Sequence, residues 1–173
     1  MYMAAMFSMH AVAQLILTIV VPVLLVQGAP VTLALKALQA VDPNGVPGPR
    51  EWLVIALDSS LLRFITHPWT ALTLLVMGVY GLCLEVVFDA AVSEHASHML
   101  MIGYFLLSGA LFFASVSGVE SVPRMMPGRG RIAILLCAFS QFAIAGVVVL
   151  NMREVLGDVF YRSLKLSWHA DLL

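Results

Sequence analysis

Imidazole and thioether side chains recur at helical spacing where two apolar stretches of the sequence begin. Met6 and His10 are four residues apart, and His98 and Met101 are three residues apart, so each pair shares one face of a helix. Imidazole nitrogen and thioether sulfur are ligands that Cu(I) prefers. If the two stretches pack together near these ends, the side chains form a soft-metal site. We therefore predict four metal ligands: His10, His98, Met6 and Met101.

Each of these residue types also has an ordinary role in a helical protein. Methionine fills gaps in apolar cores, and a histidine in an apolar helix can simply hydrogen-bond a neighbouring helix. Ionisable groups inside an apolar stretch are costly and usually functional, which favours a role for His98. Glu85 and Asp89 fit a solvated helix end as well as a site, and His67, just before a proline, is typical of a structural position.

Other chemistry finds little support in the sequence. It contains no Walker loop, Gly-x-Ser-x-Gly, Cys-x-x-Cys or His-Glu-x-x-His pattern, so we predict that the protein is not an enzyme. The formal net charge of -1 gives no basic field for nucleic acid. Cys83 and Cys137 both fall inside apolar runs, where a structural disulfide is not expected.

The elements that carry these residues are four apolar runs, each long enough to cross a bilayer, which takes about 20 residues in a helix. Only 11% of the residues are charged, and the mean hydropathy is +0.98. These values predict an all-α integral membrane protein, a four-helix bundle formed by a single domain over residues 1–173. The expected spans cover residues 4–26, 69–88, 95–118 and 132–152.

Three further segments are helical in pattern but too short or too charged to span. We expect them to lie in the membrane interface, where aromatic and amphipathic helices are favoured. Turn-forming residues at 42–49 separate the first two, and Pro68 begins the second span. The expected interfacial helices cover residues 31–41, 51–66 and 153–168.

Loop cations predict the orientation of the bundle. The connections after the first and third spans carry Lys and Arg, whereas the short connection after the second span carries none. The positive-inside rule places the cation-bearing connections in the cytoplasm, although the C-terminal tail is also basic. His10 and His98 then lie on the same, outer side. Small residues in the third span, Gly103 and Gly109 among them, predict close helix packing.

Several stretches of the chain resemble the CtaG-type family of cytochrome c oxidase assembly factors. The resemblance is carried by residues 20–38, which include Gly28-Ala29-Pro30, by the His67-Pro68 segment, and by residues 87–91, 157–163 and 168–173. The last of these fits the actinobacterial version, in which the domain is often fused to a copper-resistance-type membrane domain. The resemblance implies a multi-pass protein of the bacterial plasma membrane that helps to deliver copper to the oxidase.

The family's histidine pattern is only partly present. Members usually carry a second histidine at the position of Gln14, and further histidines at or near positions occupied here by Ile102, Tyr104 and Phe142. The matched ligands are therefore reduced to His10 and His98, which implies weakened or lost Cu(I) binding.

Three functions remain open on the sequence. The leading one is a membrane accessory or assembly factor of a copper-containing respiratory oxidase, with lipid and oxidase subunits as partners. The alternative is a non-catalytic structural subunit of a larger membrane complex that binds no metal. A small transporter would need polar groups near the bilayer midplane, and Gln141 is nearly the only such residue.

Overall fold

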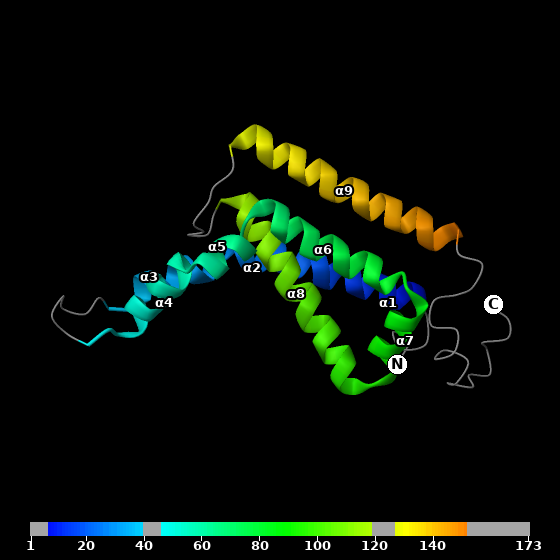
Figure 1. Ribbon diagram of the computed structural model, residues 1–173, viewed down its shortest axis with the longest axis horizontal. Coiled ribbons are helices and arrows are strands. Elements are labelled where there is room, and N and C mark those ends of the chain that lie inside the picture. The colour runs from blue at the N-terminus through cyan, green and yellow to red at the C-terminus, as the bar shows by residue number, and fades with distance from the viewer. Residues whose placement is uncertain (1–6, 40–45, 119–126, 152–173) are drawn as a thin grey trace.

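The computed structural model describes residues 7–39, 46–118 and 127–151, and within these ranges every regular element is a helix (Figure 1). Helix α8 (His95–Ser117) is the centre of the packing, because it contacts the first helical run on one side and α6 (Pro68–Leu82) on the other. Helix α9 (Gly128–Asn151) packs mainly on α6. The predicted all-α class is confirmed for the described residues.

The predicted first span is helical from Phe7, and residues 4–6 lie outside the described part. It consists of three consecutive helices: α1 (Phe7–Leu15), the π-helix η2 (Ile16–Val20) and α2 (Val21–Gln27). The wide turn has a local cause. Pro22 has no N–H, so it cannot donate to the carbonyl of Thr18 four residues earlier. The preceding N–H, that of Val21, donates to Ile16 with the spacing of a π-helix.

Helix α2 ends at a strained junction, beyond which α3 continues the helical run. Gly28 N–H donates to the carbonyls of Leu24 and Leu25, and Ala29 then adopts a left-handed conformation with φ of 46°. Helix α3 (Pro30–Ala37) follows, with its proline at the first position, where a missing N–H costs little. The predicted helix 31–41 is thus confirmed up to residue 37, and residues 40–41 lie outside the described part.

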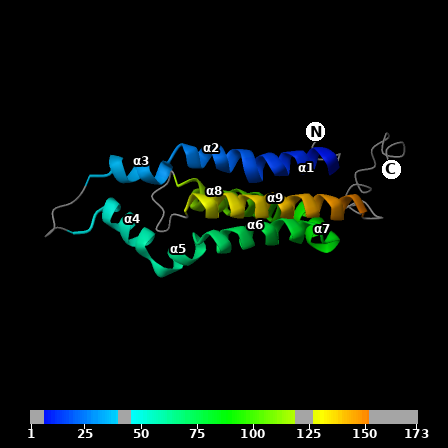
Figure 2. The same cartoon turned by 90° about the horizontal axis from the view of Figure 1, so that it is seen from above.

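The predicted helix 51–66 is in fact two helices, α4 (Pro49–Asp58) and α5 (Ser60–Ile65). Ser59 between them is extended, with ψ of 141°, and its Oγ accepts a hydrogen bond from the N–H of Leu62 at 3.2 Å. A serine that caps a new helix in this way ends the old one, because its backbone has left the helical region. Figure 2 shows α3, α4 and α5 extending from one end of the bundle. Their position at a membrane surface stays a prediction.

The predicted continuous span 69–88 is wrong. Helix α6 has 15 residues, about 22 Å at 1.5 Å per residue, which is shorter than the roughly 30 Å hydrocarbon core. Leu84 is extended, with ψ of 118°, and a separate helix α7 (Glu85–Ser93) begins at the acidic residue that follows. In the described part of the chain, three helical runs are long and apolar enough to cross a membrane: His10–Ala37, His95–Ser117 and Gly128–Leu150. The four-span bundle is therefore not confirmed.

The last two predicted spans agree with the structure. Helix α8 ends one residue before the predicted limit, where Gly118 adopts φ of 66°. Helix α9 begins four residues earlier than predicted, and residue 152 lies outside the described part, as does the predicted tail helix 153–168.

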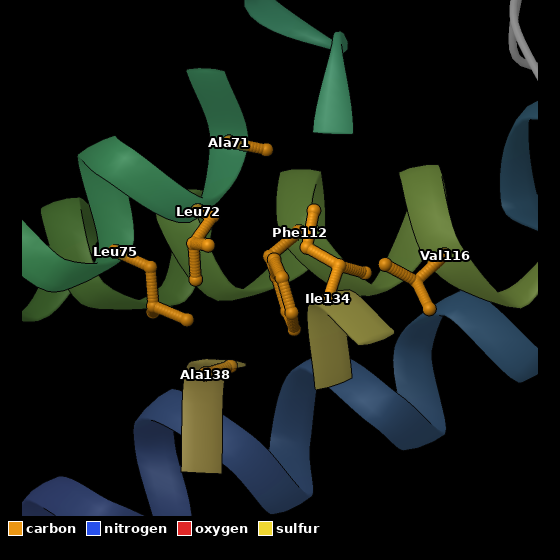
Figure 3. Packing of buried hydrophobic residues seen from close by; sticks show 7 residues of the cluster. All are labelled: Ala71, Leu72, Leu75, Phe112, Val116, Ile134 and Ala138. Atoms are coloured by element: carbon orange, nitrogen blue, oxygen red, sulfur yellow. The ribbon is translucent and has the colours of Figure 1, made fainter. Parts of the chain in front are cut away.

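A compact apolar cluster joins α6, α8 and α9 (Figure 3). Seven buried side chains form it: Ala71, Leu72, Leu75, Phe112, Val116, Ile134 and Ala138. The outward face of α9 is apolar too, with Leu136 and Phe139 both more than 60% exposed. An apolar surface of this kind matches a lipid environment.

Close helix contact depends on Gly109 and not on Gly103. A Cβ atom at Gly109 would collide with the carbonyl oxygen of Thr18 and lie 2.8 Å from Pro22 Cγ. A Cβ atom at Gly103 would meet nothing within 4 Å. The close-packing prediction is therefore confirmed for Gly109 and wrong for Gly103.

Candidate functional site

Two histidines meet where α1, α7 and α8 come together, a region that we call the histidine end. The ring centroids of His10 on α1 and His98 on α8 are 5.8 Å apart, with a tilt of 49° between the rings. Phe88 on α7 packs its ring at 81° to that of His10, with centroids 5.5 Å apart. The first and third helical runs are thus in contact near these ends, which is the condition on which the predicted metal site depends.

The backbone explains why these histidines meet. His10, Gln14 and Thr18 follow one another at four-residue spacing, so they share a face of the first helical run. Thr18, at the C-terminal end of this face, lies against Gly109 of α8, and His10, at its N-terminal end, lies against His98. Both helices therefore run in the same direction along this contact, and the close approach at Gly109 sets the spacing between them.

Polar atoms at the histidine end lack partners. Three buried side-chain atoms in the described ranges make no hydrogen bond: Nε2 of His10, Nε2 of Gln14 and Oδ1 of Asp89. An unsatisfied buried polar group costs about 1–3 kcal/mol. Sequence reasoning treated Gln14 only as a missing histidine and Asp89 as a helix end. No sequence pattern reveals this lack of partners. Gln14 lies one turn after His10 on the first helical run, and Asp89 follows Phe88, whose ring packs on His10, so both are candidate ligand-contacting groups.

The described side chains at the histidine end offer fewer ligands than a complete metal site has. No group of three or more His, Cys, Asp or Glu side chains that could hold a metal occurs within residues 7–39, 46–118 and 127–151. The pair of imidazoles remains, and Nε2 of His10 forms no hydrogen bond with the described residues. Met101 is 7% exposed and lies one turn after His98 on α8, and Met6 lies outside the described residues. Two imidazoles and a nearby thioether fit a soft monovalent cation better than a hard divalent one.

The remaining sequence candidates lie apart from this pair or bond elsewhere. His95 is exposed, and Met99 is 48% exposed. The Asn151 amide donates to the carbonyl of Val147 at 2.8 Å, within its own helix. Gln141 is half-buried and accepts a hydrogen bond from the hydroxyl of Tyr80 at 3.1 Å, which links α9 to α6.

Tyr104 occupies a position where the resemblance implies a histidine, but it faces another helix. Its hydroxyl donates to the carbonyl of Leu74 on α6 at 2.6 Å, and its ring lies against Gly78. Six residues separate it from His98, which corresponds to a rotation of about 120° around α8. Tyr104 therefore links α8 to α6 and does not belong to the histidine pair.

The opposite end of the bundle carries the cations, and we call it the basic end. The described Lys and Arg residues all lie there: Lys36, Arg50, Arg63, Arg129 and Arg131. Arg50 donates to the carbonyl of Leu35 at 3.2 Å, and Arg131 donates to that of Ser117 at 3.2 Å. Apart from histidines, the ionisable residues of α7 and the start of α8, at the histidine end, are all acidic: Glu85, Asp89 and Glu94. The described Lys and Arg residues therefore lie at the end opposite the histidine pair, and the side of the membrane that each end faces stays a prediction.

The chain is similar in sequence to several mycobacterial proteins. It is 39% identical over 171 residues to an uncharacterized protein of Mycobacterium leprae, and 38% identical over 172 residues to uncharacterized proteins of Mycobacterium bovis and Mycobacterium tuberculosis. Each alignment covers 99% of this chain and 26% of the relative, so the chain spans about a quarter of the length of these proteins. No solved structure matches it.

A family model covers the whole chain, residues 1–173, and its description is cytochrome c oxidase caa3 assembly factor. The match confirms the family that the Gly28-Ala29-Pro30 and His67-Pro68 segments indicated, and it extends over the whole chain. The chain belongs to the CtaG family of caa3-type cytochrome c oxidase assembly factors.

Proposed function

We propose that the chain is a membrane accessory domain that assists assembly of a caa3-type oxidase in the bacterial plasma membrane and carries Cu(I) weakly between His10 and His98. Family membership supports the link to the oxidase. One observation carries the copper assignment: the two imidazoles are 5.8 Å apart between centroids, and Nε2 of His10 has no hydrogen-bond partner in the described part of the chain.

The site's residues suit a cargo that must be released. Two imidazoles, one from each of two parallel helices, bind a metal less tightly than the three or four ligands of a storage site. Met101 supplies a soft atom on the same helix as His98. Phe88 covers one side of His10 and limits the access of water. A copper ion held by so few ligands exchanges readily with an acceptor that offers more of them.

The alternative is a structural subunit of the mature oxidase that binds no metal. The broad apolar face of α9, with Leu150 at 85% exposure, leaves room for a neighbouring membrane helix. The two readings differ in stoichiometry, because a structural subunit stays with the complex and an assembly factor leaves it.

Deletion in the native host tests the proposal. Loss of the protein is expected to lower oxidase activity in membranes, with partial recovery when copper is added to the medium. Complementation with His98→Ala is expected to restore activity less well than complementation with His95→Ala, which alters an exposed histidine on the same helix. Unchanged oxidase activity after deletion would contradict the respiratory role. Stoichiometric co-purification with the mature oxidase would favour the structural subunit.

A further inference from the structure

Helix α8 and the first helical run touch at two levels, and they use different numbers of residues between these levels. At one level His98 lies beside His10, with ring centroids 5.8 Å apart. At the other level Gly109 lies against the carbonyl oxygen of Thr18 and the ring of Pro22. Helix α8 advances 11 positions from His98 to Gly109, whereas the first run advances 12 positions from His10 to Pro22. The first run therefore carries one residue more than α8 between the two contacts.

The extra residue matters because it decides which face of the helix His10 occupies. Successive side chains of an α-helix are about 100° apart around the axis. Eleven positions bring a side chain back to within about 20° of its starting face, which is why His98 and Gly109 share a face of α8. Twelve positions of unbroken α-helix would leave His10 about 120° away from the face that Pro22 occupies. A uniform α-helix would thus turn His10 away from α8.

The π-helix η2 removes this mismatch. The N–H of Val21 donates to the carbonyl of Ile16, five residues earlier, so this turn holds one residue more than an α-turn. The rotation that one residue contributes, about 100°, is thereby taken out of the run. His10 then lies about 20° from the face of Pro22, the same small offset as on α8. The run stays helical through the wide turn (Figure 2), so the two helices match at both levels.

Two residues favour the wide turn. Pro22 has no N–H for the carbonyl of Thr18, so the α-helical hydrogen bond between them cannot form. Thr18 is 2% exposed, and its hydroxyl donates to the carbonyl of Gln14 at 2.6 Å, a type of contact that often bends helices. Pro22 is also fully buried, with its ring against Gly109. The wide turn and the contact with α8 therefore depend on the same proline.

We propose that Pro22 is a positioning residue for the candidate metal site and acts through η2, which turns His10 towards His98. The inference rests on the proposed function only where it assigns Cu(I) binding to His10. Without the wide turn, Ala11 would occupy the face that His10 occupies now, and the site would lose one of its two imidazoles. Pro22 controls the site through the rotation of the helix, so it needs no contact with the metal.

Cross-linking measures which residue faces α8. In a variant with Cys83 and Cys137 replaced by alanine, His98→Cys is combined either with His10→Cys, the position-10 pair, or with Ala11→Cys, the position-11 pair. A short bifunctional thiol reagent is applied to each pair in membranes. With the native proline, the position-10 pair is expected to be cross-linked at least threefold more than the position-11 pair.

Two further changes move the preference and bring it back. Pro22→Ala restores an N–H, so the turn can become α-helical, and the position-11 pair is then expected to be cross-linked more than the position-10 pair. Deletion of Ile16 in addition removes the extra residue and is expected to restore the preference for the position-10 pair. Ile16 is 47% exposed, so its deletion removes little packing. If Pro22→Ala does not fold, Pro22→Val supplies the same N–H with a volume closer to that of proline.

A Cu(I) titration of variants that keep both histidines separates this inference from the proposed function. Pro22→Ala is expected to lower the affinity at least tenfold, and the additional deletion of Ile16 is expected to return it to within threefold of the wild type. A purely structural role of Pro22 would not be rescued by a deletion. An unchanged preference for the position-10 pair in Pro22→Ala, or no recovery on deletion, would overturn the inference. The expected cross-linking without Cu(I) binding in any variant would support the positioning role and contradict the copper role.

Discussion

The two ends of the bundle differ in whether their partly or fully buried polar side chains have hydrogen-bond partners. At the basic end, Arg50 and Arg131 bond to helix carbonyls, and Glu51 accepts from the N–H of Gly48 at 2.9 Å. At the histidine end, three buried polar atoms of His10, Gln14 and Asp89 have no partner among the described residues. Polar groups in a membrane protein are costly unless they are satisfied. The bonds at the basic end are made to backbone groups near helix ends, and the unpartnered groups at the histidine end are those that the proposed ligand would contact.

The largest expected effect is on thiol labelling, which reports the side of the membrane that each end of the bundle faces. In a variant with both native cysteines replaced by alanine, Glu94→Cys at the histidine end should react fully with a membrane-impermeant thiol reagent added outside intact cells. Arg129→Cys at the basic end should react only after the membrane is opened, because the cations should face the cytoplasm. Labelling at both positions in lysed cells is the control for accessibility. The reverse pattern would place the histidine pair on the cytoplasmic side.

The second prediction tests the close contact between α8 and the first helical run at Gly109. Gly109→Ala should lower the free energy of unfolding in mixed detergent micelles by about 1–3 kcal/mol, because the new methyl group collides with the first helical run. Gly103→Ala is the matched control on the same helix. It should leave the protein unchanged or more stable by roughly 0.5–1 kcal/mol, because its methyl group meets nothing within 4 Å. Equal effects of the two variants would refute the proposed close approach.

The smallest effect concerns the basic end. Ala29 has φ of 46°, a conformation that costs a residue with a Cβ atom roughly 1–2 kcal/mol. Ala29→Gly should therefore raise the free energy of unfolding by about 0.5–1 kcal/mol, after the greater unfolded entropy of glycine is subtracted. Ala56→Gly, an exposed position inside α4, should lower it by a similar amount. Destabilisation by Ala29→Gly would show that the left-handed junction is absent in the membrane.

Much of the histidine end could be predicted from the sequence. The spacing of His10 and His98 within apolar runs, with a charge pattern that predicts both on one side, was enough to name them as one candidate site, and the structure adds their contact. Helix α8 was predicted to within one residue, because its apolar run is bounded by polar residues at the start and glycine at the end. Gln14 and Asp89 were not recognised as unsatisfied, because satisfaction depends on neighbours from other helices.

The errors lie where the hydrophobic pattern continues through a break in the backbone. Residues 81–88 are apolar apart from Glu85 and carry no proline, so nothing marks the extended Leu84 that ends α6. Ser59 was hidden in the same way, since serine is tolerated inside helices as well as at their caps. The prediction for Gly103 failed for another reason. The small size of a glycine permits a close helix contact, but whether another helix lies against it depends on the face of α8 that the glycine occupies.

The copper site is the central claim, and an equilibrium titration of the purified chain against a competing Cu(I) chelator tests it most directly. The wild type should bind one Cu(I) weakly, and His10→Ala or His98→Ala should each lower the affinity at least tenfold, about 1.4 kcal/mol. His95→Ala should have no effect, because that side chain is exposed on the same helix. Gln14→His with Ile102→His should raise the affinity, since each new imidazole lies one turn from His10 or His98. Binding of Cu(I) that is unchanged by His98→Ala would contradict the account.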